Sequence, residues 1–335
     1  MARSSAAVAT LCTVLACGGE KAAPTTPSAA TPPPIPTLAA GTTLTFVSGA
    51  GAAPVPGASV VITGQSGAGP LSDTVMADSQ GRIVLSRSAL LTPPPTMDVV
   101  APGYLTRNTV LRTDGARLFS LWPSEGVAPA DLTASLVYSP SACPAENAPT
   151  QPMHRMRTGM PVVVVLDPSV QSERAVTRHE EAVAAMNAIL GAAQYSLSRS
   201  PAPPGAVAIA VRIDASPSSC TAPENSSRTI ASTSISFSAA GEIISGSIFY
   251  CEPRWAEAPG TVTHEIGHTA GFRHSPDSND VMFCSTARRT LSFSDREATA
   301  MGLMRQRRPG NRWPDNDRDA TAALGAGGRE TFVCQ

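Results

Sequence analysis

Residues 264–274 read HEIGHTAGFRH, and the interpretation of the whole chain depends on this stretch. Two histidines four positions apart on a helix project from one face, so His264 and His268 can turn their rings toward one metal ion. Gly271 can adopt a positive φ, which suits a sharp reversal at the end of that helix. The reversed chain then brings His274 back as a third nitrogen ligand.

Three protein ligands with an open fourth position are typical of catalytic zinc, whereas structural zinc sites are closed by four ligands. Glu265 stands beside the first ligand, where its carboxylate can take the proton of a water that zinc has acidified. Three of the five histidines of the chain lie within this stretch, which argues against scattered surface imidazoles. The pattern therefore predicts a zinc-dependent hydrolase with His264, His268 and His274 as ligands and Glu265 as general base.

The pattern HExxHxxGxxH resembles the zinc signature of the metzincin metallopeptidases, which continues to a methionine turn. Here Met282 follows His274 by eight residues, a short spacing that is similar to the matrixin-like branch. The resemblance implies a zinc endopeptidase in which the Met282 side chain lies beneath the metal as an apolar floor. No tyrosine occurs in residues 283–285, which departs from the astacin-like branch.

Composition restricts the partners of the protein. The 335 residues carry a formal net charge of -1, so there is no electrostatic footprint for nucleic acid or for an anionic membrane surface. No apolar run reaches the roughly eighteen residues that a transmembrane helix needs. We expect a protein or peptide substrate, no nucleic-acid partner, and membrane contact only through an N-terminal anchor.

The beginning of the chain resembles a secretory signal, with Arg3, a short apolar run at residues 6–16 and then Cys17 before two glycines. Its ending is similar to a bacterial lipobox, in which the cysteine is lipidated, although Val14 and Leu15 depart from the preferred residues. We expect export and a lipid anchor at Cys17 on the cell envelope. The alternative is an ordinary cleaved signal and a secreted protein.

Composition divides the chain into five segments. Residues 1–17 are the signal and lipobox, and residues 18–41, rich in Pro, Ala and Thr, form a linker that cannot bury a core. Residues 42–122 contain short β-rich runs between glycine-rich turns, which predicts a small antiparallel sandwich. Residues 123–158 connect this sandwich to a catalytic domain at residues 159–335.

The sandwich segment resembles the carboxypeptidase regulatory-like (transthyretin-like) module, on residues 54–58, 78–81 and 101–104. It contains no catalytic set, and Asp78 is better explained as a turn residue than as a ligand. In the connector that follows, residues 132–138 are expected to form a strand.

The last segment predicts an α+β domain. Its elements are a buried strand at 161–166, a long amphipathic helix at 173–190, a strand at 207–213, a strand pair within 232–250, the zinc helix at about 260–271 and a helix with a capping box from Ser294 to Glu297. This order resembles the metzincin domain: a twisted mixed sheet, a long helix, a zinc helix, a Met-turn and a C-terminal helix, here preceded by a small all-β sandwich. The resemblance makes the strand at 243–250 the candidate edge for an extended peptide substrate.

Five cysteines follow residue 142: Cys143, Cys220, Cys251, Cys284 and Cys334. In an exported chain they indicate disulfides, and their odd number leaves one free or paired between chains. We expect Cys143 to form a disulfide rather than to bind the zinc. We expect Cys284 to form a disulfide that holds the Met-turn in place.

Several polar residues around the motif have open interpretations. Asp277 and Asp280 either hydrogen-bond a ligand histidine from behind or are solvated loop residues. His179 is expected to be solvent-facing or capped rather than a fourth ligand, and Arg273 has no assigned role.

Two alternative functions remain open. The protein could be a surface-anchored binding lipoprotein whose zinc site is structural or vestigial. It could also be a zinc amidase that acts on cell-wall material with the same residues. The presence of Glu265 disfavours the first, because a structural site does not need the carboxylate.

Overall fold

The computed structural model describes residues 34–111, 117–141, 149–216, 220, 229–318 and 327–334. The predicted signal with Cys17, most of the 18–41 linker, and Cys143 lie outside these residues. Of the described residues, those from Ile35 onward cluster as one compact unit. None of its helices has the length and apolar character required to cross a bilayer.

Two separate hydrophobic clusters lie within this unit. The first, here called the sandwich core, is built from residues between Leu38 and Leu121. The second, here called the main core, is built from residues between Trp122 and Cys334. The chain therefore folds as an α+β protein with one all-β part and one mixed part, as its sequence predicts.

Two sheets enclose the sandwich core, with orders β5-β2-β9 and β4-β3-β7-β8. Neighbouring strands are antiparallel except β2 and β9, which run parallel, so the expectation of a purely antiparallel sandwich is wrong at that pair. Five strands were predictable from β-rich runs, whereas β4 and β9 were not. The strands are β2 (Thr43–Ser48), β3 (Ser59–Ser66), β4 (Gly69–Met76), β5 (Arg82–Val84), β7 (Thr96–Val100), β8 (Arg107–Val110) and β9 (Leu118–Leu121).

The folded part begins earlier than the predicted boundary at residue 42. Strand β1 (Thr37–Leu38) pairs with β6 (Ala89–Leu90), and the Leu38 side chain is buried in the sandwich core. The predicted end of the linker at residue 41 is therefore wrong. Thr37 and Leu38 already form a strand, and the Leu38 side chain packs in the sandwich core.

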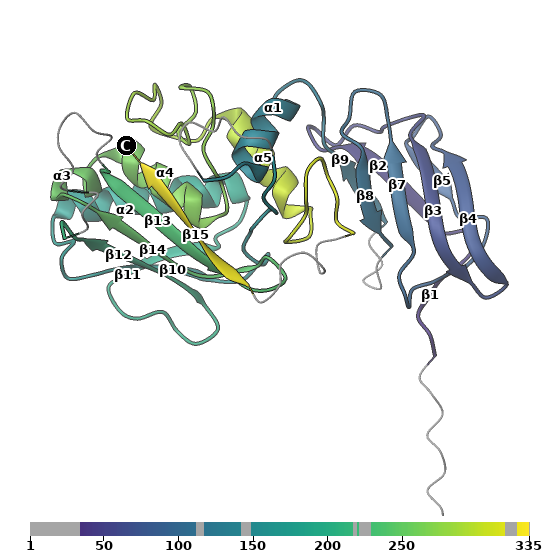
Figure 1. The fold of residues 1–335 in the computed structure, drawn as a ribbon, viewed down its shortest axis with the longest axis horizontal. Coiled ribbons are helices and arrows are strands. Elements are labelled where there is room, and N and C mark those ends of the chain that lie inside the picture. Colours follow the sequence, from purple (N-terminus) through teal and green to yellow (C-terminus); the bar gives the residue numbers. More distant parts are fainter. Residues whose placement is uncertain are drawn as a thin grey trace, which may run out of the picture. The chain divides into compact units, whose positions relative to one another are not determined.

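A six-stranded mixed sheet forms the second part of the molecule, with the order β11-β10-β12-β14-β13-β15 (Figure 1). The first four strands in this order run parallel, and β13 and β15 are each antiparallel to their neighbour. Their bounds are β10 (Val162–Leu166), β11 (Tyr195–Ser198), β12 (Val207–Ile213), β13 (Ala231–Phe237), β14 (Ile243–Tyr250) and β15 (Gly328–Cys334).

The strand order contradicts one sequence expectation. Strand β14 is paired on both sides, with β12 and with β13, so it cannot be the free edge for a substrate. Strand β13 would be the edge if β15 did not lie along it. The long-range pairing of β15 could not be read from local sequence patterns.

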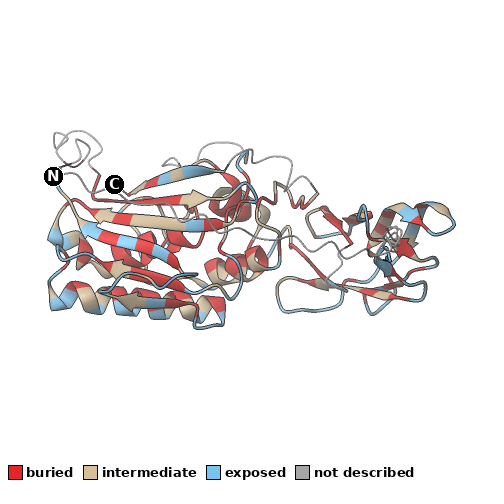
Figure 2. Ribbon diagram, turned by 90° about the horizontal axis from the view of Figure 1, so that it is seen from below, coloured by how far each residue is buried: buried red, intermediate tan, exposed pale blue. Residues whose placement is uncertain are grey.

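The helices follow the sequence closely where local signals are strong. Helix α2 (Glu173–Leu190) has the predicted bounds, because the Ser172 side chain accepts a hydrogen bond from the backbone at its start and Gly191 ends it with a φ of 61°. Helix α5 (Asp295–Arg305) starts with the predicted capping box. Figure 2 shows buried and exposed residues alternating around such helices, as expected where one face packs on a sheet.

The connector does not contain the strand expected at residues 132–138. Helix α1 (Ala130–Thr133) continues directly into a π-helical turn at Ala134–Tyr138. Leu136 and Tyr138 are fully buried in the main core. A short apolar run fits either a strand or a buried helical turn, and here the second is correct.

Candidate metal centre

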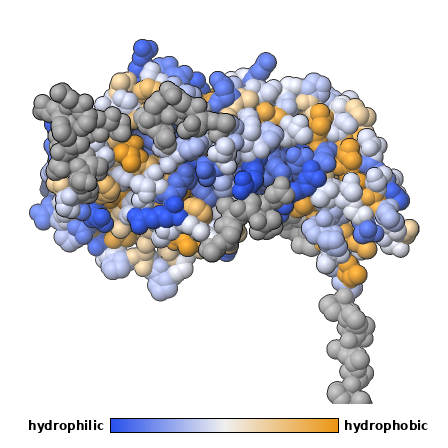
Figure 3. All heavy atoms as spheres, viewed as in Figure 1, coloured by the Kyte–Doolittle hydropathy of each residue, from blue (hydrophilic) through white to orange (hydrophobic). Residues whose placement is uncertain are grey.

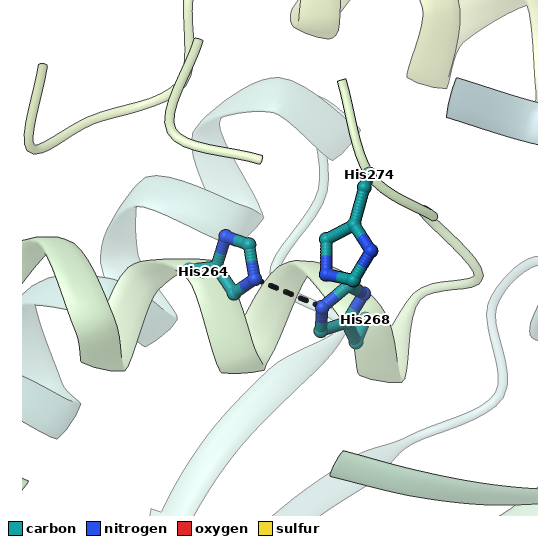
Figure 4. Close-up of side chains that lie close together, drawn as sticks. All are labelled: His264, His268 and His274. Atoms are coloured by element: carbon teal, nitrogen blue, oxygen red, sulfur yellow. Dashed lines mark hydrogen bonds between the residues drawn. The ribbon is translucent and has the colours of Figure 1, made fainter. Parts of the chain in front are cut away.

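Helix α4 (Pro259–Thr269) carries the first two predicted ligands. It packs against α2, and β13 lies alongside it. The rings of His264 and His268 point from one face of the helix, and their Nε2 atoms lie 3.0 Å apart (Figure 4). Both side chains are fully buried.

The third predicted ligand joins them through a chain reversal. Gly271 has a φ of +105°, and a Cβ atom there would lie 1.9 Å from the carbonyl oxygen of His154. Both facts require glycine at this position. The chain that leaves it places His274 beside the helix, with its ring centroid 4.9 Å from that of His268 (Figure 4). Side-chain nitrogens of the three histidines lie within 4.8 Å of one another.

Backbone carbonyls fix how the first two rings are protonated. The Nδ1 atom of His264 lies 2.8 Å from the carbonyl oxygen of Val281, and that of His268 lies 2.7 Å from the carbonyl oxygen of Phe272. A carbonyl can only accept, so Nδ1 donates in both rings and Nε2 keeps a lone pair. Burial also lowers the pKa of both histidines well below its usual value. The rings are therefore neutral, which is the form that binds a metal.

This protonation makes the site fit a cation. Two Nε2 lone pairs face each other at 3.0 Å with no proton to share, and a cation between His264 and His268 would remove that repulsion. The described residues thus contain a possible metal-binding group of three histidines.

Glu265 lies beside this group and is fully buried. Its Oε2 atom accepts a hydrogen bond of 2.5 Å from the Thr233 hydroxyl on β13, whereas Oε1 has no hydrogen-bond partner among the described residues. Burial raises the pKa of this carboxyl to about 7. A buried carboxylate oxygen without a partner is costly, and a metal-linked water would supply one.

Met282 lies against the helix that carries the first two ligands. It is fully buried, and a Cβ atom on Gly267 would be only 2.3 Å from its sulfur. Glycine thus lets the thioether pack directly on α4, one residue before His268. The Glu297 carboxylate holds the turn in place by accepting hydrogen bonds from the backbone N–H groups of Met282 (2.8 Å) and Ser294 (2.7 Å).

The acidic residues after His274 do not hydrogen-bond the rings of His264 and His268. The partners of His264 and His268 are carbonyl groups, so the expectation of a carboxylate behind either of these rings is wrong. Asp280 instead accepts hydrogen bonds from Ser294 (2.7 Å) and Arg296 (3.0 Å), and Asp277 pairs with Arg296. These contacts tie the Met-turn to the start of α5.

For His179, expected to be solvent-facing or capped rather than a ligand, the solvent-facing alternative is wrong. It is fully buried on α2, with Nδ1 2.7 Å from the Ala175 carbonyl oxygen and Nε2 3.2 Å from the Tyr250 hydroxyl. These contacts explain it as a satisfied core histidine, and it does not belong to the metal-binding group among the described residues.

Three of the four cysteines that the structure describes are in disulfides. Cys220 pairs with Cys251, and Cys284 is also disulfide-bonded, whereas Cys334 is free and buried. Among the described cysteines, Cys334 is the free one. Its sulfur lies within 4.8 Å of a ring nitrogen of His264 and a carboxylate oxygen of Glu265.

Sequence reasoning missed the role of β15. The sequence after Arg305 is polar and rich in glycine, but β15 brings both Phe332 and Cys334 to the histidines. The sequence feature that could have predicted this strand is the short β-prone run Thr331-Phe332-Val333, which lies next to a cysteine.

A scan against models of known protein families finds no match, and a search of curated proteins finds no similar one. The interpretation of this site therefore depends on its own geometry and on the sequence motif.

Proposed function

We propose that this protein is a zinc-dependent endopeptidase of the metzincin type. In this proposal His264, His268 and His274 bind zinc, and Glu265 is the general base. The observation that carries it is the buried Oε1 atom of Glu265, which has no hydrogen-bond partner among the described residues, in a carboxylate that has an oxygen within 4.8 Å of a ring nitrogen of His264, one of the three converging histidines. A structural metal site would gain nothing from that oxygen, whereas a hydrolase needs it.

The order of elements supports the same proposal. A strand, a long helix, further strands, the histidine helix, the Met282 turn and a last helix follow one another in the mixed sheet domain. This order resembles the metzincin domain, and the packing of Met282 against α4 agrees with an apolar floor.

Zinc is the ion that this donor set suits best. Three neutral, buried imidazoles favour zinc over magnesium or calcium, which prefer oxygen ligands. Zinc held by three nitrogen ligands supplies an acidified water and polarises a peptide carbonyl.

The residues of the chain then carry the proton. Glu265 takes it from the attacking water through Oε1 and later gives it to the leaving amine. The Thr233 hydroxyl holds Oε2, so that the other oxygen faces the reacting groups. The carbonyls of Val281 and Phe272 keep the ligand rings in the tautomer that binds metal.

We also propose that the protein is exported and anchored through lipid on Cys17. The disulfide between Cys220 and Cys251 supports an oxidising compartment. Replacement Cys17→Ala should move the protein from the membrane fraction to the soluble fraction of the cell envelope. Retention of the variant in the membrane fraction would contradict the anchor and leave the peptidase proposal untouched.

The test of the enzyme is Glu265→Gln. We expect the variant to keep one equivalent of zinc and to lose hydrolysis of unstructured peptides by roughly 10²–10⁴-fold, the usual contribution of a general base. The matched control is Glu181→Gln, an exposed glutamate on α2 whose side chain is 53% exposed, and it should leave both quantities unchanged. Zinc content is measured by elemental analysis, and hydrolysis by product mass.

The remaining outcomes decide between the functions. Full hydrolysis by Glu265→Gln would overturn the assigned mechanism. Bound zinc with no hydrolysis of peptides but with release of cell-wall amides would favour the amidase. Bound zinc with no hydrolysis of either substrate by wild type would favour a structural zinc in a binding lipoprotein.

A further inference from the structure

A cavity of about 210 Å³ lies between the sandwich strands β8 and β9 and the segment that follows α5. One water needs only about 10–15 Å³ of such space, so the cavity has room for a small ligand. Its lining is unusual in composition, because five of the eleven lining residues are arginines: Arg107, Arg155, Arg305, Arg307 and Arg308. None of the three histidines of the metal centre lines it.

The carboxylates around this cavity balance only part of its positive charge. Asp315 pairs with Arg307 at 2.7 Å. Asp317 pairs with Arg107 at 3.3 Å. The guanidinium group of Arg308, a half-buried residue, has no hydrogen bond or ion pair with any described residue. The lining therefore carries more positive than negative charge, although the whole chain has a formal net charge of -1.

Arg107 gives independent evidence that a ligand belongs in this cavity. The residue is only 5% exposed, and its Nε atom is buried without a hydrogen-bond partner among the described residues. Burial and the nearby charge of Arg307 also lower the pKa of Arg107. A buried donor without a partner is costly, and so is a crowd of like charges. A ligand that is both negatively charged and rich in acceptor oxygens would relieve both costs.

Backbone hydrogen bonds hold the walls of the cavity together. On β8, the Asn108 N–H group donates to the Asp315 carbonyl at 2.9 Å, and the Asn108 carbonyl accepts from the Asp317 N–H group at 2.7 Å. The backbone N–H group of Arg308 donates to the Asp317 carboxylate at 3.0 Å. The arginine-bearing segment is thus fixed against the strand by contacts that do not use the guanidinium of Arg308. Such preorganisation lowers the ordering cost of binding.

We propose that this cavity binds a phosphate group, with Arg107 and Arg308 among its donors. Guanidinium groups bind phosphate through paired, charge-assisted hydrogen bonds. A phosphate monoester carries about two negative charges near neutral pH and three acceptor oxygens, which suits the excess of positive charge better than a carboxylate with one charge and two oxygens. The proposal does not depend on the metal centre.

A second hollow provides space for an organic part of such a ligand. Its volume is about 350 Å³, and it shares Arg107, Leu118 and Gln306 with the lining of the first. The ligand is therefore either the free phosphate ion or a phosphate ester whose organic group extends from the arginines into this second hollow. The two sources present the same phosphate chemistry to the arginines.

Isothermal titration calorimetry of the full-length chain with inorganic phosphate tests the site. We expect saturable binding of one equivalent by wild type. Arg308→Gln should weaken it roughly 10–100-fold, because a hydrogen bond between charged groups is lost, and Arg308→Lys should weaken it less, because the charge remains. The matched control is Arg174→Gln on α2, which removes the charge of an exposed arginine outside the cavity and should bind as wild type does.

The other outcomes are equally informative. No saturable binding by wild type would overturn the proposal. Equal weakening by Arg308→Gln and Arg174→Gln would also overturn it, since general attraction to positive charge would then suffice. Tighter binding of acetate than of phosphate would contradict the ligand class. A parallel titration with glycerol phosphate identifies the source: tighter binding of the ester supports an organic part in the second hollow, and tighter binding of inorganic phosphate supports the free ion.

Discussion

The sandwich and the mixed sheet domain differ in what they bury. The described sandwich residues bury apolar side chains, and their ion pairs lie at the surface, as in Arg82 with Asp78. One exception is Arg107, whose guanidinium pairs with Asp317 of the other part. The mixed domain instead buries many titratable groups: His154, His179, His264, Glu265, His268, Arg273, His274, Asp280, Glu297, Arg307, Asp315 and Asp317.

This difference separates a part that buries mostly apolar side chains from a part that also buries many titratable ones. Burial of a charge destabilises a fold unless the charge is paired and hydrogen-bonded, and even paired charges add little net stability. Their concentration in one domain is therefore not explained by stability. It is explained if several of them hold or serve a bound ion.

The surface shows no matching contrast. On the face drawn in Figure 3, hydrophobic side chains are scattered among hydrophilic ones. The exposed large hydrophobic residues come from both parts: Ile35, Met76, Val84, Val100, Leu118, Val127, Ile244 and Leu291. Single exposed apolar residues of this kind are ordinary, so the comparison concerns the interiors.

The largest expected effect is on the buried pair of Arg307 and Asp315. Both side chains are fully buried, and the guanidinium donates three hydrogen bonds of 2.7 to 3.1 Å to the carboxylate. Arg307→Met should leave Asp315 charged and unpaired, and the free energy of unfolding should fall by about 3–5 kcal/mol. Urea unfolding measures the change.

A second variant distinguishes pairing from packing. Removal of both charges in Arg307→Met with Asp315→Leu should restore most of the lost stability, since no unpaired charge remains. A double variant as unstable as the single one would show that the loss is due to shape rather than charge. The contrast between the two interiors would then be weaker than proposed.

The next effect concerns pH and His179. Burial lowers its pKa from 6.5 to about 4, while the unfolded chain takes up the proton near 6.5. The stability contributed by the neutral ring is therefore complete above pH 6.5 and is lost as the pH falls toward 4. Between pH 7.5 and pH 5 the loss should be about 2 kcal/mol.

The measurement compares wild type with His179→Gln by urea unfolding at both pH values, with a chelator present so that metal release does not contribute. The variant should be less stable at pH 7.5 and should lose about 2 kcal/mol less on acidification. Equal losses in the two proteins would mean that His179 is not the neutral, doubly hydrogen-bonded ring described above. Histidines of the metal site affect both proteins alike and cancel in the difference.

Sequence-based prediction was most accurate for features whose residues lie close together in the chain. The three ligands and Glu265 fall within eleven residues, so one helix and one turn suffice to assemble them. The bounds of α2 and the capping box of α5 depend on side chains within a few residues of the helix ends. Such local signals keep their meaning whatever the tertiary structure.

Sequence reasoning failed for residues that are in contact in the fold but lie far apart in the chain. Cys334 meets His264 seventy residues away in the chain, a contact that only the pairing of β15 with β13 creates. Arg307 lies in a polar stretch of the sequence, yet it is one of the largest fully buried side chains. A polar sequence gives no warning that its charges find buried partners, because that depends on packing between elements.

The smallest expected effect is on the exposed pair of the sandwich. The side chains of Arg82 and Asp78 are 51% and 48% exposed, so solvent screens their attraction. Asp78 still caps its turn by accepting hydrogen bonds from the backbone N–H groups of Gln80 and Arg82, which a change of the Arg82 side chain does not remove. Arg82→Met should therefore leave the urea midpoint unchanged within error, at low and at high salt. A marked, salt-dependent loss would show that the sandwich also depends on its charges, and the two parts would then differ in the position of their ion pairs but not in their need for them.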